Sequence, residues 1–175
     1  DLTSSSGRFV LRDFQQKKAF SSFLPGIAGL MGIPMWVFYV NRGQGIAGFG
    51  VESKDHPLME YQCAQRAYQV AAQLGFRTFL KGKRGSTVWN YEPFGLLGGD
   101  QVKRSMTTGL NGLEIEEVNE SLGFKINVLY FLLPNEPFSA LVRKVTITNI
   151  RKEALKVDTL DGLPEDLETG WVLKP

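Results

Sequence analysis

The sequence is poor in the residues that build disulfides and metal sites. Its 175 residues include one cysteine, Cys63, and one histidine, His56. A single cysteine cannot form a disulfide within the chain, and zinc sites normally use three or four nitrogen or sulfur ligands. The composition therefore predicts no internal disulfide and no zinc site, and we expect no other metal centre and no bound cofactor.

The sequence also lacks a surplus of charge of either sign. Twenty Lys and Arg against 18 Asp and Glu leave a formal net charge of +2. Nucleic acids and anionic membrane surfaces are bound through concentrated positive charge. We therefore expect neither a nucleic-acid partner nor a membrane partner.

Long uninterrupted apolar runs are missing as well. The longest apolar stretch, Phe23 to Val40, contains three glycines and two prolines, whereas a membrane-spanning helix needs about 20 consecutive apolar residues. Residues 1–6 do not have the charged segment followed by an apolar one that is typical of a signal peptide. These features predict a cytoplasmic chain, and its start at Asp1 indicates a piece of a longer protein.

What the sequence does contain is short β-type runs separated by its 19 glycines and eight prolines. This pattern favours an antiparallel sandwich over alternating strands and helices. We predict a mainly β fold, an antiparallel β-sandwich with at most one or two short helices. The predicted strands are residues 7–14, 35–40, 45–51, 76–81, 87–91, 103–108, 113–119, 124–132, 140–149 and 155–160.

Two segments depart from the simple alternation of a half-buried strand. Residues 35–40 are apolar at every position, which indicates a strand covered on both faces. Between Met59 and Leu74 small and apolar residues recur at spacings of three and four, with Pro57 before them and Gly75 after, which predicts a helix.

Residues 161–175 are acidic and contain proline and glycine. We predict that they form a linker or a non-native tail after a sandwich of residues 1–160.

Several segments resemble catalytic or nucleotide-binding motifs, but a purely structural role explains each of them better. Residues 43–48 fit a dinucleotide-binding G-x-G-x-x-G pattern, but no helix pattern follows them directly, so they indicate a tight turn with close backbone packing.

Glu114 and Glu116 could pair as the two carboxylates of a glycoside hydrolase. Their alternation with Leu113 and Ile115 favours a solvent-facing position instead. Cys63 lies among apolar residues, which indicates a buried structural thiol. We predict no catalytic residue.

Candidate binding residues come from two aromatic pairs and one turn. Trp36 and Phe38 share one strand face, as do Trp89 and Tyr91, and such rings either stack on sugars or, more often, fill a core or an interface. The turn after residue 40 combines glycines with a planar guanidinium, so it can dock closely on another surface. The candidate binding or interface residues are Trp36, Asn41, Arg42, Gln44, Trp89 and Tyr91.

Three blocks of sequence resemble a known family. They are FSSFLPGIAG (residues 20–29), IPMWVFYVNRGQ (residues 33–44) and GFRTFLK (residues 75–81). Together they resemble the N-terminal region of β-1,2-oligoglucan phosphorylases, which belong to the cellobiose phosphorylase family of inverting glycoside phosphorylases. The resemblance covers most of residues 7–164. It implies an N-terminal β-sandwich, with at most a short helix around residues 68–80.

The resemblance also implies a function for the parent protein. In such enzymes an acid in a downstream helical barrel protonates the glycosidic oxygen while inorganic phosphate attacks the anomeric carbon, which yields glucose 1-phosphate. This chain has no such barrel, so none of its residues takes the catalytic role. The implied function is a non-catalytic sandwich that packs on the barrel and on the interface of a homodimer, in an enzyme that binds glucooligosaccharide and phosphate. The alternative is a free-standing carbohydrate-binding or adaptor sandwich.

Overall fold

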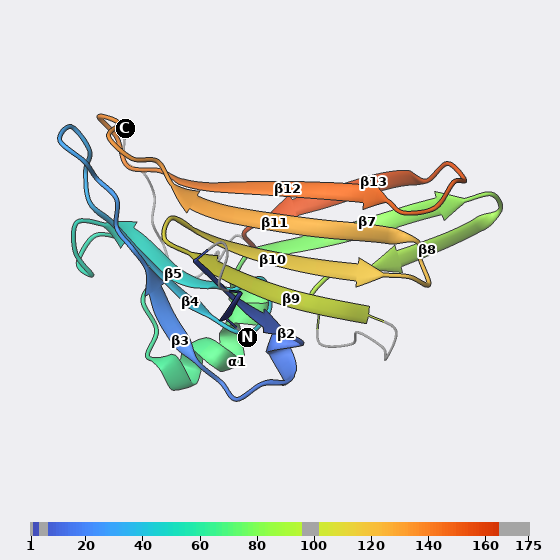
Figure 1. Cartoon of the computed structure of the whole chain (residues 1–175), viewed down its shortest axis with the longest axis horizontal. Coiled ribbons are helices and arrows are strands. Elements are labelled where there is room, and N and C mark those ends of the chain that lie inside the picture. Colours follow the sequence, from blue (N-terminus) through green and yellow to red (C-terminus); the bar gives the residue numbers. More distant parts are fainter. Residues whose placement is uncertain (1, 4–6, 96–101, 165–175) are drawn as a thin grey trace.

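Three antiparallel sheets and one α-helix make up the described part of the chain, residues 2–3, 7–95 and 102–164, in the computed structural model (Figure 1). The predicted mainly β class and antiparallel sandwich are confirmed. The six-stranded sheet has the order β1 (Leu2–Thr3), β2 (Arg8–Arg12), β9 (Val102–Gly109), β10 (Gly112–Asn119), β11 (Phe124–Leu132) and β12 (Leu141–Asn149). The four-stranded sheet has the order β3 (Ser21–Leu24), β4 (Met35–Val40), β5 (Ile46–Val51) and β6 (Pro57–Met59), and the three-stranded sheet the order β13 (Lys156–Gly162), β7 (Arg77–Arg84) and β8 (Thr87–Tyr91).

One main core joins the three sheets. Along β11 every second residue from Phe124 to Leu132 is buried, as the period of two in a strand requires. These side chains form a cluster with Val37 of the four-stranded sheet and Leu80 of the three-stranded sheet. The six-stranded sheet is therefore one layer of the sandwich, and the two smaller sheets pack against its inner face.

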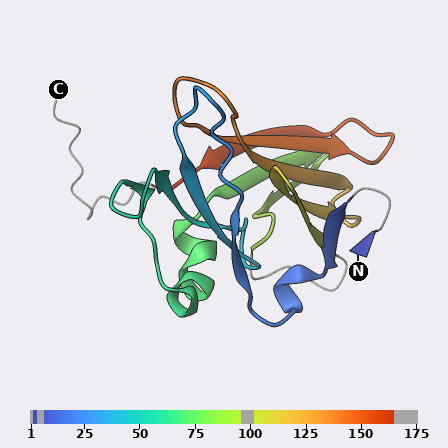
Figure 2. The same ribbon diagram turned by 60° about the vertical axis from the view of Figure 1, so that its left-hand side comes forward.

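β4 is buried on both faces, as its apolar sequence predicts. Its residues Val37 and Tyr39 belong to the main core. Its residues Phe38 and Val40 form a second cluster with Ala67 and Ala71 of helix α1 (Ala64–Leu74), which lies on the outer side of the four-stranded sheet (Figure 2). The second face of β4 is thus covered by this chain itself.

The helix is shorter than the predicted segment from Met59 to Leu74. It begins at Ala64, because residues 57–59 form the edge strand β6, which pairs with β5. Proline is tolerated in an edge strand, so Pro57 marks a strand here and not a helix start. Cys63 precedes the helix and is exposed, which corrects its interpretation as a buried thiol. A 3-10 helix, Phe14–Gln16, is the other helical element of the described residues.

The first two glycines of the G-x-G-x-x-G segment form a tight turn, as predicted, and the third, Gly48, lies in β5. Gly43 and Gly45 have φ angles of 54° and 90°, in the left-handed region that favours glycine. A Cβ atom on Gly43 would lie 2.7 Å from the Cα atom of Ala72 in α1. The absence of side chains therefore lets the β4–β5 turn lie directly against the helix.

The predicted boundary between residues 160 and 161 falls inside a strand. β13 continues to Gly162, and Asp161 pairs with Thr78 in the ladder between β13 and β7. The rest of the predicted tail, from residue 165 onward, lies outside the described residues. Within the described ranges no helix is long and apolar enough to cross a membrane.

Candidate functional site

The β4–β5 turn, predicted as a docking corner, is held inside the fold. Asn41 is fully buried. Its Nδ2 donates to the carbonyl oxygens of Phe14, at 2.8 Å, and Lys18, at 3.0 Å, while its Oδ1 accepts from the backbone N–H of Phe20 at 2.9 Å. One side-chain amide thus fixes the whole segment that leads from the 3-10 helix to β3.

Gln44, the second polar residue of this turn, is also buried and bonds to two sheets. Its Nε2 donates to Oγ1 of Thr78 at 3.0 Å, and its Oε1 accepts from Nη2 of Arg143 at 2.6 Å. Arg143 is itself almost fully buried and pairs with Asp161. Arg143 was not among the residues predicted from the sequence, although it lies two and four residues before Val145 and Ile147 in β12 and so shares their inward face.

Arg42 is the member of the turn that is only half-buried. Its Nη1 donates to the carbonyl oxygen of Asn41 at 2.7 Å, and its Nη2 to that of Lys17 at 3.1 Å. Asn41 and Gln44 do not reach the surface, because both are buried and bonded within the chain. The docking role of this corner stays a prediction, and it depends on Arg42.

The predicted aromatic residues pack on other rings or on glycine. The Trp89 ring stacks on Phe124 with 5.6 Å between centroids, and Tyr91 meets Phe124 edge to face at 5.7 Å. Trp36 donates from Nε1 to the carbonyl oxygen of Ser53 at 2.8 Å, and its ring lies close over Gly50. Trp89 and Tyr91 therefore serve the core, while Trp36 belongs to a cluster nearer the surface.

A buried ion pair that sequence analysis missed lies on the inner face of the six-stranded sheet. Glu117 is fully buried; its Oε2 accepts from Nε of Arg104 at 2.8 Å and from the backbone N–H of Phe94 at 2.7 Å. Nη1 of Arg104 donates to Oε1 of Gln15 at 2.7 Å. The burial of Glu117 could have been predicted from the sequence. Glu117 follows Ile115 by two residues in the same strand, so both side chains lie on its inward face.

The hydroxyl of Tyr91 is buried near this pair and has no hydrogen-bond partner among the described residues. A buried polar group without a partner loses its hydration and gains nothing in return. We expect Tyr91→Phe to leave the unfolding free energy unchanged or to raise it by up to about 1 kcal/mol. Tyr130→Phe is the matched control, because the Tyr130 hydroxyl accepts from Nε of Arg143 at 3.2 Å, and its loss should lower the unfolding free energy by about 1 kcal/mol.

Urea denaturation at neutral pH measures both variants. A loss for Tyr91→Phe as large as that for Tyr130→Phe would show that the Tyr91 hydroxyl has a partner. Burial, followed by the negative charge of Glu117, raises the pKa of Tyr91 to about 12. The unfolding free energy of the wild-type chain should therefore fall as the pH rises from about 10, the unfolded value, toward 12, and Tyr91→Phe should lack this part of the fall.

Two loops at one end of the sandwich are joined to each other (Figures 1 and 2). Residues 25–34 connect β3 to β4, and residues 133–140 connect β11 to β12. Asn135 donates from its backbone N–H to the carbonyl oxygen of Ala28 at 2.8 Å and accepts on Oδ1 from the backbone N–H of Met31 at 3.1 Å. Oγ of Ser139 donates to the carbonyl oxygen of Ile33 at 3.0 Å. We call these two loops the loop pair.

The loop pair presents apolar side chains to solvent. Leu30 is 99% exposed and Phe138 54% exposed, and Met31 and Ile33 are exposed as well. At the base of the β3–β4 loop, Phe23 and three neighbouring rings form an aromatic cluster that is partly open to solvent: Phe23, Trp36, Phe38 and Tyr61. Exposed apolar surface of this kind marks interaction sites in soluble proteins.

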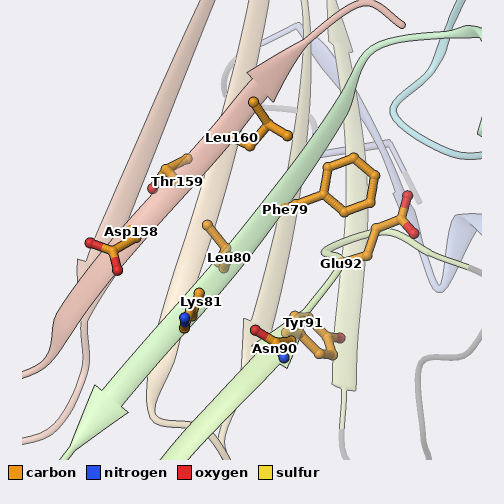
Figure 3. A pocket seen from close by; sticks show the side chains of 9 residues that line it. All are labelled: Phe79, Leu80, Lys81, Asn90, Tyr91, Glu92, Asp158, Thr159 and Leu160. Carbon is orange, nitrogen blue, oxygen red and sulfur yellow. The ribbon is translucent and has the colours of Figure 1, made fainter.

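A separate hollow of about 490 Å³ lies on the outer face of the three-stranded sheet (Figure 3). Its lining comes from that one sheet and the residue after β8: Phe79, Leu80, Lys81, Asn90, Tyr91, Glu92, Asp158, Thr159 and Leu160. The Phe79 ring lies between Leu160 and Glu92 in this view. Arg77 holds Glu92 through two hydrogen bonds of 2.7 and 2.9 Å, and its guanidinium carbon lies 4.7 Å from the centroid of the Phe79 ring.

The described residues contain no group of three or more His, Cys, Asp or Glu side chains that could hold a metal ion. Glu114 and Glu116 lie on the outer face of β10, as predicted, where they form surface ion pairs with Arg8 and Lys125. The sequence matches no protein-family model and no curated protein. The candidate sites are therefore two surfaces, the loop pair with its aromatic cluster and the hollow on the three-stranded sheet.

Proposed function

We propose that this chain is the non-catalytic N-terminal β-sandwich of an inverting glycoside phosphorylase that acts on β-1,2-glucooligosaccharides. In this proposal the sandwich packs on the catalytic helical barrel and on the interface of a homodimer. The resemblance of residues 20–29, 33–44 and 75–81 to such enzymes supports it, and so does the antiparallel sandwich that they form part of. The observation that supports it most is the loop pair, whose apolar side chains are exposed on two loops that hydrogen bonds hold together.

Burial of this surface against another domain would be favourable. Each large apolar side chain gains about 1.5–3 kcal/mol when it moves from water to an interface. The hydrogen bonds of Asn135 and Ser139 fix both loops beforehand, so docking loses little loop entropy. Aromatic residues and methionine, which protein interfaces favour, are part of this surface, and charged residues are few. The loop pair and its aromatic cluster thus have the chemistry of a surface that another protein domain covers.

The chemistry of phosphorolysis belongs to the barrel in this proposal. The chain alone should therefore release no glucose 1-phosphate from β-1,2-linked glucooligosaccharides and inorganic phosphate. We also propose a cytoplasmic location, since a chain with a single cysteine depends on no disulfide. The second candidate function, a carbohydrate-binding sandwich, is favoured by the hollow on the three-stranded sheet.

The test uses the full-length enzyme that contains this sandwich. We expect the double variant Leu30→Ser and Phe138→Ser to lower the thermal midpoint of the enzyme and to shift its dimer toward monomer in light scattering. The isolated chain should be affected far less, because both side chains already contact solvent there. The control is Ile150→Ser, an exposed apolar residue next to the other end of β12, which should leave both readouts unchanged.

Three results would contradict the proposal. One is a double variant that assembles and melts like the wild-type enzyme. Another is release of glucose 1-phosphate by the isolated chain above a protein-free control. The third is a coding sequence that contains this sandwich and no helical catalytic barrel.

A further inference from the structure

The outer face of the three-stranded sheet places an apolar row beside a polar row. Leu160 pairs with Phe79 across β13 and β7, and these two side chains form the apolar row. Two residues along, Asp158 pairs with Lys81, and Lys81 pairs with Asn90 of β8, which gives a polar row across all three strands. Residues two apart on one strand face are about 7 Å apart, so the rows lie about one sugar ring from each other.

The apolar row is accessible from solvent. Leu160 is 71% exposed and Phe79 36% exposed. Arg77 covers one side of the Phe79 ring and is itself fixed by Glu92. The remaining ring surface and the Leu160 side chain form a small apolar floor, which suits the face of a pyranose that carries C–H groups.

The charges at the lining of the hollow are matched. Lys81 lies beside Asp158 in the ladder, and Arg77 is paired with Glu92. The lining together with Arg77 therefore carries no surplus of charge of either sign. The polar row nevertheless offers hydrogen-bond donors and acceptors side by side, since an Asn amide provides both and the two charged groups provide one kind each. Such a row suits a ring of hydroxyl groups, each of which donates and accepts.

The shape of the hollow points to a chain-like ligand. Its lining residues all come from one sheet and the residue after β8, so the described residues give the hollow a floor and no roof. A small cofactor is normally enclosed on most sides, whereas an oligosaccharide can rest on such a floor and extend beyond it at both ends.

We propose that the hollow on the outer face of the three-stranded sheet binds a neutral oligosaccharide, with one sugar ring on Phe79 and Leu160 and its hydroxyl groups on Asp158, Lys81 and Asn90. This inference develops the second candidate function, a carbohydrate-binding sandwich, and does not rest on the docking role. The loop pair and the hollow belong to different sheets and share no residue, so either can fail in experiment without the other.

The experiment follows amide signals of the nitrogen-labelled chain by NMR during titration with a β-1,2-linked glucotriose and, separately, a β-1,4-linked glucotriose. We expect saturable shifts at the residues of the polar and apolar rows with at least one of the two sugars. Phe79→Ala should weaken the affinity for that sugar about tenfold, and Leu160→Ala should weaken it severalfold. Leu160 is mostly exposed, so this second variant keeps the test valid if Phe79→Ala fails to fold.

Val88→Ala is the matched control. Val88 is exposed on the same sheet and pairs with Lys83, but it does not line the hollow. Its replacement should change the affinity by less than about twofold. The proposal is overturned if neither sugar shifts signals of the hollow, if Val88→Ala weakens binding as much as Leu160→Ala, or if an anionic oligosaccharide of equal length binds more tightly than the neutral ones.

Discussion

Glu117→Ala is expected to lower the unfolding free energy by about 3–5 kcal/mol, a large part of the roughly 5–15 kcal/mol that stabilises a typical domain. The variant leaves the guanidinium of Arg104 buried without its counter-charge, because its Nε donates to Glu117 at 2.8 Å. It also removes the acceptor of the backbone N–H of Phe94, which bonds the same carboxylate at 2.7 Å. Urea denaturation, followed by tryptophan fluorescence and circular dichroism, measures the loss.

Two controls separate the buried pair from the effect of losing a glutamate. Glu116→Ala removes the neighbouring carboxylate on the outer face of β10, where it pairs with Lys125 at 3.3 Å near solvent, and should cost no more than about 1 kcal/mol. The double variant Glu117→Leu and Arg104→Met replaces both charges with apolar groups and should recover much of the stability. Equal losses for Glu117→Ala and Glu116→Ala would show that burial of the pair contributes nothing.

The longer strands could be predicted because their side chains alternate or are apolar throughout. β4, β8 and β11 were predicted with the bounds that they have in the structure. The strands that were missed are β1, β3 and β6, which are short, and β3 begins with two serines. Such strands form because a neighbour is present to pair with them. Their own residues carry little of the signal.

Of the buried polar residues, some were predictable and others were not. Glu117 and Arg143 lie in strands whose inward face is evident from the alternating apolar residues around them, so their burial could have been inferred. The loop pair could not have been, because its hydrogen bond between Met31 and Asn135 joins residues 104 positions apart. The hollow likewise depends on the pairing of β13 with β7, which no local pattern specifies.

Asn41 has a structural role that its sequence context did not indicate. A polar residue at the end of an apolar strand fits a surface turn, and from the sequence we expected it to contact a partner. In the structure its amide makes three hydrogen bonds within the chain. The pattern did not reveal that residues 14–20 cross this turn and cover it.

Asn41→Ala is therefore expected to lower the unfolding free energy by about 3–5 kcal/mol, because it leaves two carbonyl oxygens and one backbone N–H without their partner. Arg42→Ala, in the next position, should cost only about 1–2 kcal/mol, since Arg42 is half-buried and water can reach the carbonyl oxygens that it releases. Chemical denaturation of both variants measures the difference. If Asn41→Ala unfolds at the wild-type urea concentration, the amide does not hold this corner, and a role for Asn41 in docking returns.

Asn41→Asp separates hydrogen bonding from packing, because it keeps the size of the side chain. The new carboxylate can still accept from the backbone N–H of Phe20, but it faces the carbonyl oxygens of Phe14 and Lys18, to which Asn41 donates. Two acceptors then repel the carboxylate, so at neutral pH this variant should be at least as unstable as Asn41→Ala.

Burial beside carbonyl oxygens raises the pKa of a carboxyl group in the folded state above its unfolded value of about 3.9. The unfolding free energy of Asn41→Asp relative to Asn41→Ala should therefore rise as the pH falls through that raised pKa, because the protonated acid donates again to one of the two carbonyl oxygens. A relative stability that stays constant between about pH 7 and 4 would show that the carbonyl oxygens do not face this side chain.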